Sequence, residues 1–185
     1  MAMNFIPSPL PGLYVIEPVV WKDERGYFFE SYQQKDFQEA GIAADFVQDN
    51  QSLSQKGTLR GLHAQAPPFA QGKLVRVIQG RVLDVAVDIR KNSPTFGQHF
   101  SCELSGDNFN MLWIPPGFLH GFVTLENDTI FSYKVSSGMY NKAAEIGVRF
   151  NDPDLSIDWQ MPESELILSE KDQALPAFKD FVSPF

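Results

Sequence analysis

The chain has 185 residues, 43% of them hydrophobic and 21% charged, which is typical of a soluble globular protein with enough residues for a full hydrophobic core. Its formal net charge of −8 disfavours general nucleic-acid binding, so an anionic ligand would require a local cluster of arginine and lysine. The single cysteine excludes an internal disulfide framework and favours a reducing compartment.

No targeting or membrane segment is evident. The N-terminus lacks a basic region followed by an apolar one, and nowhere do about 18 apolar residues follow one another. We therefore expect a cytoplasmic protein that does not bind a membrane. Because the sequence shows no repeat, linker or low-complexity segment, a single domain over residues 1–185 is predicted.

The first 45 residues predict short elements. Residues 13–20 alternate loosely and contain a proline, which favours an edge strand. A turn at residues 23–26 leads into an expected strand at 27–32. Residues 34–40 predict a short helix that Gly41 terminates.

From Phe46 onward, strand patterns follow one another with turn residues between them. The expected strands are 46–54, 58–64, 73–78, 81–89, 99–104, 110–114, 119–125 and 129–135. Since no long helix intervenes, the pattern favours an all-β sandwich or jelly roll. After Ser136 an irregular tail is expected, with a short helix near 170–175.

Polar residues alternate along the expected strand 46–54. Gln48, Asn50, Ser52 and Ser54 share one face, where a sandwich strand usually turns apolar side chains inward. A wet or ligand-lined interior is therefore predicted.

Arg60 and His63 lie in the next strand with Gly61 between them. In a regular strand they would point to opposite faces, but a glycine permits a bulge or a sharp bend that could turn both into one cavity. Alone, such a pair is more often a surface arginine and a core histidine. Lys73 begins the following apolar segment, so its ammonium should either reach solvent or pair with a ligand anion.

Two segments resemble the motifs of the cupin superfamily, namely Gly57 with His63 and Pro115–His120. Metal-binding cupins have a second histidine two residues after the first and then a glutamate. Here Gln65 stands at that position, no such glutamate follows, and the whole chain has three histidines. Because amide oxygens are poor ligands for transition metals, we predict no metal site.

A series of motifs in matching order, from about residue 10 to 175, resembles the dTDP-4-dehydrorhamnose 3,5-epimerase family. These motifs are Gln48–Asn50, Arg60–His63, Ala70–Val75, Asp84–Arg90, Ser93–Gly97, Gly117–Phe122, Tyr133–Lys134, Asn151–Pro153 and Ser169–Asp172. The resemblance implies a cupin-type jelly roll, or double-stranded β-helix, with short peripheral helices. It also implies inversion of the carbons flanking the C4 ketone of dTDP-4-dehydro-6-deoxyglucose, without metal or organic cofactor.

The resemblance assigns the catalytic roles by position. It makes His63 the base that abstracts a proton and Asp172 the carboxylate that orients it. Tyr133 becomes the proton donor on the opposite face of the sugar. Lys73, with His120 nearby, would stabilise the enolate oxygen.

The resemblance also implies a substrate-binding set. Arg60 would hold a phosphate and Tyr140 would stack on thymine. The remaining positions that match nucleotide-binding residues are Arg25, Glu30, Gln48, Asn50, Glu145 and Lys171. Arg25 and Glu30 would come from the partner chain, so a homodimer with a shared site is expected.

The residue types fit this chemistry independently. A proton next to a ketone becomes removable when a fixed positive donor stabilises the enolate, and Lys73 supplies that charge. Histidine titrates near neutral pH, which suits a base, and a neutral phenol can return a proton. Taken singly, Tyr133, Asp172 and His120 would instead predict a core tyrosine, a surface charge and a turn-capping histidine. Their joint occurrence favours the site.

Two departures from the family concern the walls beside the histidines. Ala64 replaces a usual aromatic residue, and Leu119 stands where alanine is commoner. Substrate identity is therefore more open than reaction type. An enzyme that inverts C3 or C5 alone, on a related NDP-4-keto-6-deoxyhexose, remains an alternative. A metal-dependent cupin and a non-catalytic binder of sugar nucleotides are the other hypotheses.

Overall fold

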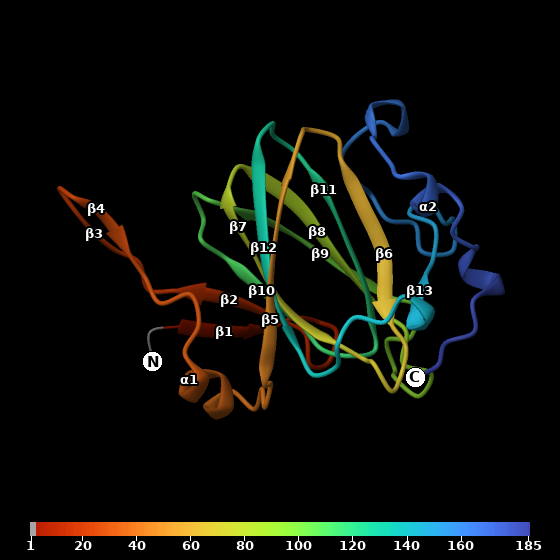
Figure 1. The fold of residues 1–185 in the computed structure, drawn as a ribbon, viewed down its shortest axis with the longest axis horizontal. Coiled ribbons are helices and arrows are strands. Elements are labelled where there is room, and N and C mark those ends of the chain that lie inside the picture. The colour runs from red at the N-terminus through yellow and green to blue at the C-terminus, as the bar shows by residue number, and fades with distance from the viewer. Residues whose placement is uncertain (1–2) are drawn as a thin grey trace.

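The computed structural model describes residues 3–185 and contains two antiparallel β-sheets that face each other (Figure 1). The first sheet has the order β1-β2-β10-β7-β12-β5 and the second β13-β6-β11-β8-β9, while β3 and β4 form a separate hairpin. The strands are β1 (Met3–Pro7), β2 (Tyr14–Pro18), β3 (Trp21–Asp23), β4 (Gly26–Phe28), β5 (Phe46–Ser54), β6 (Leu59–Gln65), β7 (Gly72–Gln79), β8 (Arg81–Asp88), β9 (His99–Ser105), β10 (Met111–Ile114), β11 (Phe118–Thr124), β12 (Thr129–Ser136) and β13 (Glu145–Gly147). The two sheets confirm the predicted jelly roll.

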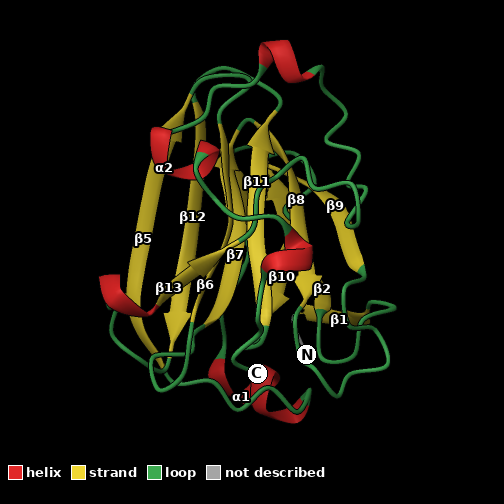
Figure 2. Ribbon diagram, turned by 90° about the vertical axis from the view of Figure 1, so that its right-hand side faces the viewer, coloured by secondary structure: helices red, strands yellow, loops and turns green. Residues whose placement is uncertain are grey.

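Helices are short and lie outside the sheets (Figure 2). They are the α-helices α1 (Gln34–Glu39) and α2 (Glu170–Gln173) and the 3-10 turns Lys142–Ala144, Glu163–Glu165 and Phe178–Asp180. As predicted, Gly41 follows the end of α1 in a left-handed conformation, with φ of +80°. No helix among residues 3–185 has the length and hydropathy needed to cross a membrane.

Side-chain alternation along the strands divides the hydrophobic residues into an inner core and two outer layers. Between the sheets, Val75 and Phe131 of the first sheet pack with Val82 and Phe122 of the second. On the outside of the first sheet, Phe37 of α1 packs on a further cluster. The C-terminal tail covers the outside of the second sheet. The inner space that is not filled with apolar side chains becomes the cavity described below.

Gly61 produces the predicted bulge in β6. Three residue steps of β6, from Arg60 to His63, match two steps of β11, so one extra residue is inserted. Gly61 has φ of +128°, and a Cβ there would lie 2.5 Å from the Cα atom of Gly121. A glycine is therefore required by conformation and by space. The bulge turns Arg60 and His63 into one cavity.

The eight strands predicted from residue 46 onward all form, with ends within one residue of the expected positions. Three other features differ. The strand expected at 27–32 ends at Phe28. The strand within residues 13–20 is not an edge, because β1, which was not predicted, pairs along its full length. The tail also contributes the unpredicted β13, which pairs with β6 at the level of His63.

Candidate active site

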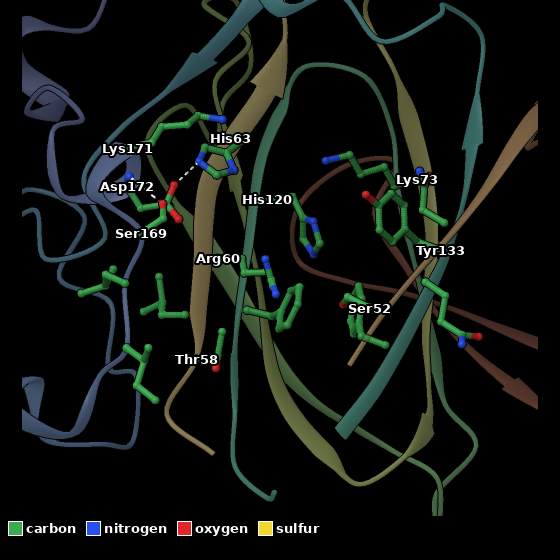
Figure 3. A pocket seen from close by; sticks show the side chains of 17 residues that line it. Ser52, Thr58, Arg60, His63, Lys73, His120, Tyr133, Ser169, Lys171 and Asp172 are labelled. Atoms are coloured by element: carbon green, nitrogen blue, oxygen red, sulfur yellow. Dashed lines mark hydrogen bonds and ion pairs between the residues drawn. The ribbon is translucent and has the colours of Figure 1, made fainter. Parts of the chain in front are cut away.

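A cavity of about 630 Å³ opens between the first sheet, on the side of β5, and β6 of the second. Eight of the predicted residues line it (Figure 3). The eight are Asn50, Arg60, His63, Lys73, His120, Tyr133, Lys171 and Asp172. His63 and Asp172 lie at one side, and Lys73 and Tyr133 at the other. Strands of both sheets and the tail helix α2 therefore contribute to one site.

His63 and Asp172 form the hydrogen-bonded pair that the resemblance implied. Nε2 of His63 lies 2.5 Å from Oδ1 of Asp172, which is 4% exposed at the start of the tail helix. Burial would raise the pKa of Asp172, but the hydrogen bond with His63 holds that pKa below its ordinary value. Ser169 caps α2 by accepting a hydrogen bond from the Asp172 N–H at 3.1 Å. An ionised carboxylate in this position fixes the tautomer and orientation of the imidazole.

A second histidine–carboxylate pair, His120 with Asp84, was not predicted. Nε2 of His120 lies 2.9 Å from Oδ2 of Asp84, whose side chain is fully buried. Burial raises the pKa of Asp84, while His120 and Lys73 oppose that rise. The sequence does contain a signal, because Asp84 interrupts an apolar strand at an inward position and aspartate is rarely buried without a partner.

Lys73 and Tyr133 come from neighbouring strands of the first sheet. Nζ of Lys73 lies 5.9 Å from the centre of the Tyr133 ring. Burial lowers the pKa of Lys73, although the carboxylates of Asp84 and Glu145 oppose this. Burial raises the pKa of Tyr133, against opposing effects of Arg60 and Asn50. The phenol thus keeps its proton at neutral pH and is available as a donor.

A second cavity of about 370 Å³ adjoins the first and is lined by polar side chains. It shares Asn50, His63, Lys73, Tyr133 and Lys171 with the first cavity, and adds Gln48, Ala64, Gln65, Gln71, Val135, Tyr140 and Glu145. Five of the eight predicted binding residues are thereby brought together at one end of the site, namely Gln48, Asn50, Tyr140, Glu145 and Lys171.

Three of these residues form a polar chain at the mouth of the second cavity. The Tyr140 hydroxyl donates to Oε2 of Glu145 at 2.9 Å, and Lys171 forms an ion pair with Oε1 of the same carboxylate. Burial would raise the pKa of Glu145, but hydrogen bonds from Lys171 and Tyr140 hold it below its ordinary value. The ring of Tyr140 is 57% exposed and is free to stack on a planar ligand.

Three of the predicted binding residues do not line the second cavity. Arg60 lines the first cavity only and donates to Oγ of Ser54 at 3.3 Å. Arg25, at the turn of the β3–β4 hairpin, and Glu30, just after it, line neither cavity. The hairpin projects away from the two sheets (Figure 1), as expected if these two residues serve a partner chain.

The two departures from the family pattern have different surroundings. Ala64 lines the second cavity and is 8% exposed. Leu119 is fully buried in the layer outside the second sheet and lines neither cavity. The expectation that Leu119 reshapes a wall of the site is therefore wrong, because β11 alternates and His120 takes the inward position.

Within residues 3–185, no group of three or more histidine, cysteine, aspartate or glutamate side chains is arranged to hold a metal ion. Gln65, at the position of the second cupin histidine, accepts a hydrogen bond from the Asn141 N–H at 2.9 Å. The Asp172 carboxylate beside His63 suits proton transfer. Metal independence stays a prediction.

The fold and the site define a jelly-roll protein equipped for acid–base chemistry, with a base, a phenol and a cation around one cavity. The family model for dTDP-4-dehydrorhamnose 3,5-epimerase matches residues 7–180. The chain is 50% identical over 171 residues to an epimerase of that name from Shigella flexneri, covering 92% of this chain and 93% of the relative.

Two solved structures are similar over nearly their whole length. One is a dTDP-4-dehydrorhamnose 3,5-epimerase from Elizabethkingia anophelis, with 54% identity, a TM-score of 0.93, and coverage of 97% and 98%. The other is a dTDP-6-deoxy-D-glucose-3,5-epimerase from Legionella pneumophila in complex with dTDP-4-keto-L-rhamnose, with 48% identity, a TM-score of 0.92, and coverage of 97% and 95%. The chain belongs to the dTDP-4-dehydrorhamnose 3,5-epimerase family and is an isomerase.

Proposed function

We propose that this protein inverts C3 and C5 of dTDP-4-dehydro-6-deoxy-D-glucose to give dTDP-4-dehydro-L-rhamnose, a step in rhamnose biosynthesis. The observation that supports this most is the placement of a base and an acid across one cavity. His63 comes from β6 of the second sheet and Tyr133 from β12 of the first. Inversion requires removal of a proton from one face and its return to the other, which this arrangement suits.

His63 removes the proton next to the C4 ketone, and the Asp172 carboxylate stabilises the resulting imidazolium. The electrons of the broken C–H bond move toward the ketone oxygen and form an enolate. The Lys73 ammonium, with His120 beside it, stabilises the enolate charge, an effect of about 3 kcal/mol or more per donor in a site shielded from water. Tyr133 then protonates the carbon from the opposite face.

The nucleotide occupies the second cavity. Tyr140 stacks on the thymine ring, and Gln48, Asn50, Glu145 and Lys171 provide polar contacts. Arg60 lines only the first cavity and is assigned to a phosphate that extends from the nucleotide into that cavity. No metal or organic cofactor takes part, so activity should survive chelator treatment and dialysis.

The functional unit is a homodimer with shared sites, in the cytoplasm. Support comes from the β3–β4 hairpin, which exposes three large aromatic side chains, Trp21, Tyr27 and Phe28, at 49%, 57% and 66%. Apolar surface of this kind is typical of a protein–protein contact. Arg25 and Glu30 then reach the nucleotide in the neighbouring chain.

An enzyme that inverts only one centre is the second candidate. Ala64 favours this candidate, because its small side chain leaves the second cavity open beside the catalytic base His63. Incubation with dTDP-4-dehydro-6-deoxy-D-glucose in deuterium oxide, followed by NMR, separates the candidates. Deuterium and inversion at both carbons support the 3,5-epimerase; incorporation at one carbon supports the alternative; none would indicate a non-catalytic binder.

Two variants test the division of roles between base and acid. His63→Ala should abolish both exchange and inversion, with a loss of about 10²–10⁴-fold, because no enolate forms. Tyr133→Phe keeps the shape of the cavity but removes the donor, so His63 can still exchange the proton on its own face. Exchange should therefore outlast inversion in Tyr133→Phe. Wild-type inversion by that variant would contradict the assignment.

A further inference from the structure

Gln65 is a buried polar residue of the site to which the proposed mechanism gives no role. It lies two residues after His63 on β6, so the two side chains share one face of the strand. Gln65 is 6% exposed and lines the second cavity. The glutamine at this position argues against a metal site but has no other assigned role. A buried amide needs hydrogen-bond partners of its own.

One end of the Gln65 amide is bound to the segment that bears Tyr140. Its Oε1 accepts a hydrogen bond from the Asn141 N–H at 2.9 Å. Gln71, just before β7, supports the same segment, since its Nε2 donates to the Gly138 carbonyl at 2.9 Å. The exposed Tyr140 ring thus stands on backbone that two glutamine side chains hold from either side.

The other end of the Gln65 amide faces the cavity. Among residues 3–185, no buried side-chain nitrogen or oxygen lacks a hydrogen-bond partner, and the one hydrogen bond of the Gln65 side chain uses Oε1. The NH₂ group therefore reaches the open space that Gln65 lines. A neutral donor in this position suits a neutral acceptor, and the nearby Lys171 charge is already paired with Glu145.

We propose that Gln65 is a nucleotide-binding residue that fixes the Tyr140 segment through Oε1 and donates from its NH₂ group to a carbonyl oxygen of the pyrimidine base. This inference rests on the proposed function, which puts the nucleotide in the second cavity. Gln65 contacts the base and not the reacting carbons. Its loss should therefore raise KM and weaken nucleotide binding while kcat changes little.

Two substitutions separate the two ends of the amide. Gln65→Glu keeps an oxygen acceptor for the Asn141 N–H but loses the NH₂ donor, whereas Gln65→Leu loses both. Gln79→Leu makes the same glutamine-to-leucine change at the exposed end of β7, outside both cavities, and serves as the control.

The measurements are titration calorimetry with dTDP, steady-state kinetics, and amide hydrogen exchange of the peptide containing Asn141. We expect both Gln65 variants to bind dTDP about twofold to tenfold more weakly, the range for one neutral hydrogen bond. Exchange at Asn141 should quicken in Gln65→Leu alone. If Gln65→Leu does not fold, Gln65→Glu still tests the donor.

Unchanged dTDP affinity in the Gln65 variants, or a fall in kcat with KM unaffected, would overturn the inference while leaving the proposed function intact. A wild-type protein that neither binds dTDP nor exchanges deuterium into the sugar would overturn both.

Discussion

Both histidines inside the cavity are paired with a carboxylate. His63 with Asp172 and His120 with Asp84 each place a carboxylate behind an imidazole, and Lys73 lies within the electrostatic influence of Asp84. A buried charge without a partner carries a large desolvation penalty, so the pairing explains how these groups persist next to an apolar core. With Nε2 of His120 directed to Asp84, the other ring nitrogen remains for the substrate.

At this scale, Asp84→Asn tests whether Asp84 positions His120. The amide has nearly the same shape but cannot stabilise a positive imidazole. We therefore expect kcat to fall about tenfold or more, and KM to change less. The fall in kcat should be smaller than the ~10²–10³-fold loss that follows removal of a whole hydrogen-bond donor. The pH profile of kcat should shift as well. Asp107→Asn, with a side chain 93% exposed on a loop, is the matched control. Wild-type kinetics in Asp84→Asn would remove Asp84 from the site.

Among the elements, the bulge of β6 determines where the catalytic side chains point. Gly61→Ala introduces a Cβ 2.5 Å from the Gly121 Cα at a positive φ. Gly41→Ala also has a positive φ, +80°, but its Cβ meets open space, so it isolates the backbone strain. We expect Gly61→Ala to cost about 1–3 kcal/mol more in unfolding free energy than Gly41→Ala, the range for overpacking.

Urea denaturation measures that difference, and turnover of the folded fraction measures the geometry of the site. Equal stability of the two variants would mean that the strands separate easily at the bulge. Full activity in Gly61→Ala would mean that Arg60 and His63 reach the cavity without the glycine bulge.

The stability of the fold should depend on pH through Asp88, the last residue of β8. Burial would raise the pKa of Asp88, but hydrogen bonds from Arg90, Ser93 and Thr95 lower it from 3.8 to about 2. A lowered pKa in the folded state means that the unfolded chain binds the proton more tightly. The stability contributed by ionised Asp88 is therefore present above pH 3.8 and is lost as the pH falls toward 2.

Asp88→Asn should therefore lower stability at neutral pH and flatten the acid side of the profile. Urea midpoints measured from pH 6 to pH 2, with Asp180→Asn on the exposed tail as the control, check this. A parallel decline in Asp88→Asn and wild type would show that other carboxylates dominate the acid response.

For the whole molecule, the central prediction is the shared site. If Arg25 acts in the partner's cavity, a mixed dimer of Arg25→Ala and His63→Ala chains contains one complete site. Refolding the two inactive variants together should therefore restore part of the activity. Mixing His63→Ala with Asp172→Asn is the control, because both residues come from the same chain and no complete site can form. Mixed dimers that show no activity in the first pairing would exclude the exchange.

The amino-acid sequence by itself predicted the strands from Phe46 to Val135 and the helix ended by Gly41, and it indicated a bulge or bend at Gly61. These features depend on local physics: alternation with period two, turn residues, and the freedom of glycine at positive φ. The polar stripe from Gln48 to Ser54 indicated a ligand-lined interior for the same reason. The catalytic residues came from a resemblance of motifs and not from periodicity.

Apart from the His63–Asp172 pair, which the resemblance implied, the tertiary structure decided which of these residues meet. His120 and Asp84 are 36 residues apart in sequence, and His63 and Asp172 are 109 apart, so no local pattern could pair them. Likewise, β1 and β13 were not predicted, and they form because a neighbouring strand offers unpaired backbone groups. The pairing of β11 and β6 with their neighbouring strands determined where the side chains of Leu119 and Gln65 lie. Local preferences select strands, whereas the register and closure of the two sheets determine which side chains share a cavity.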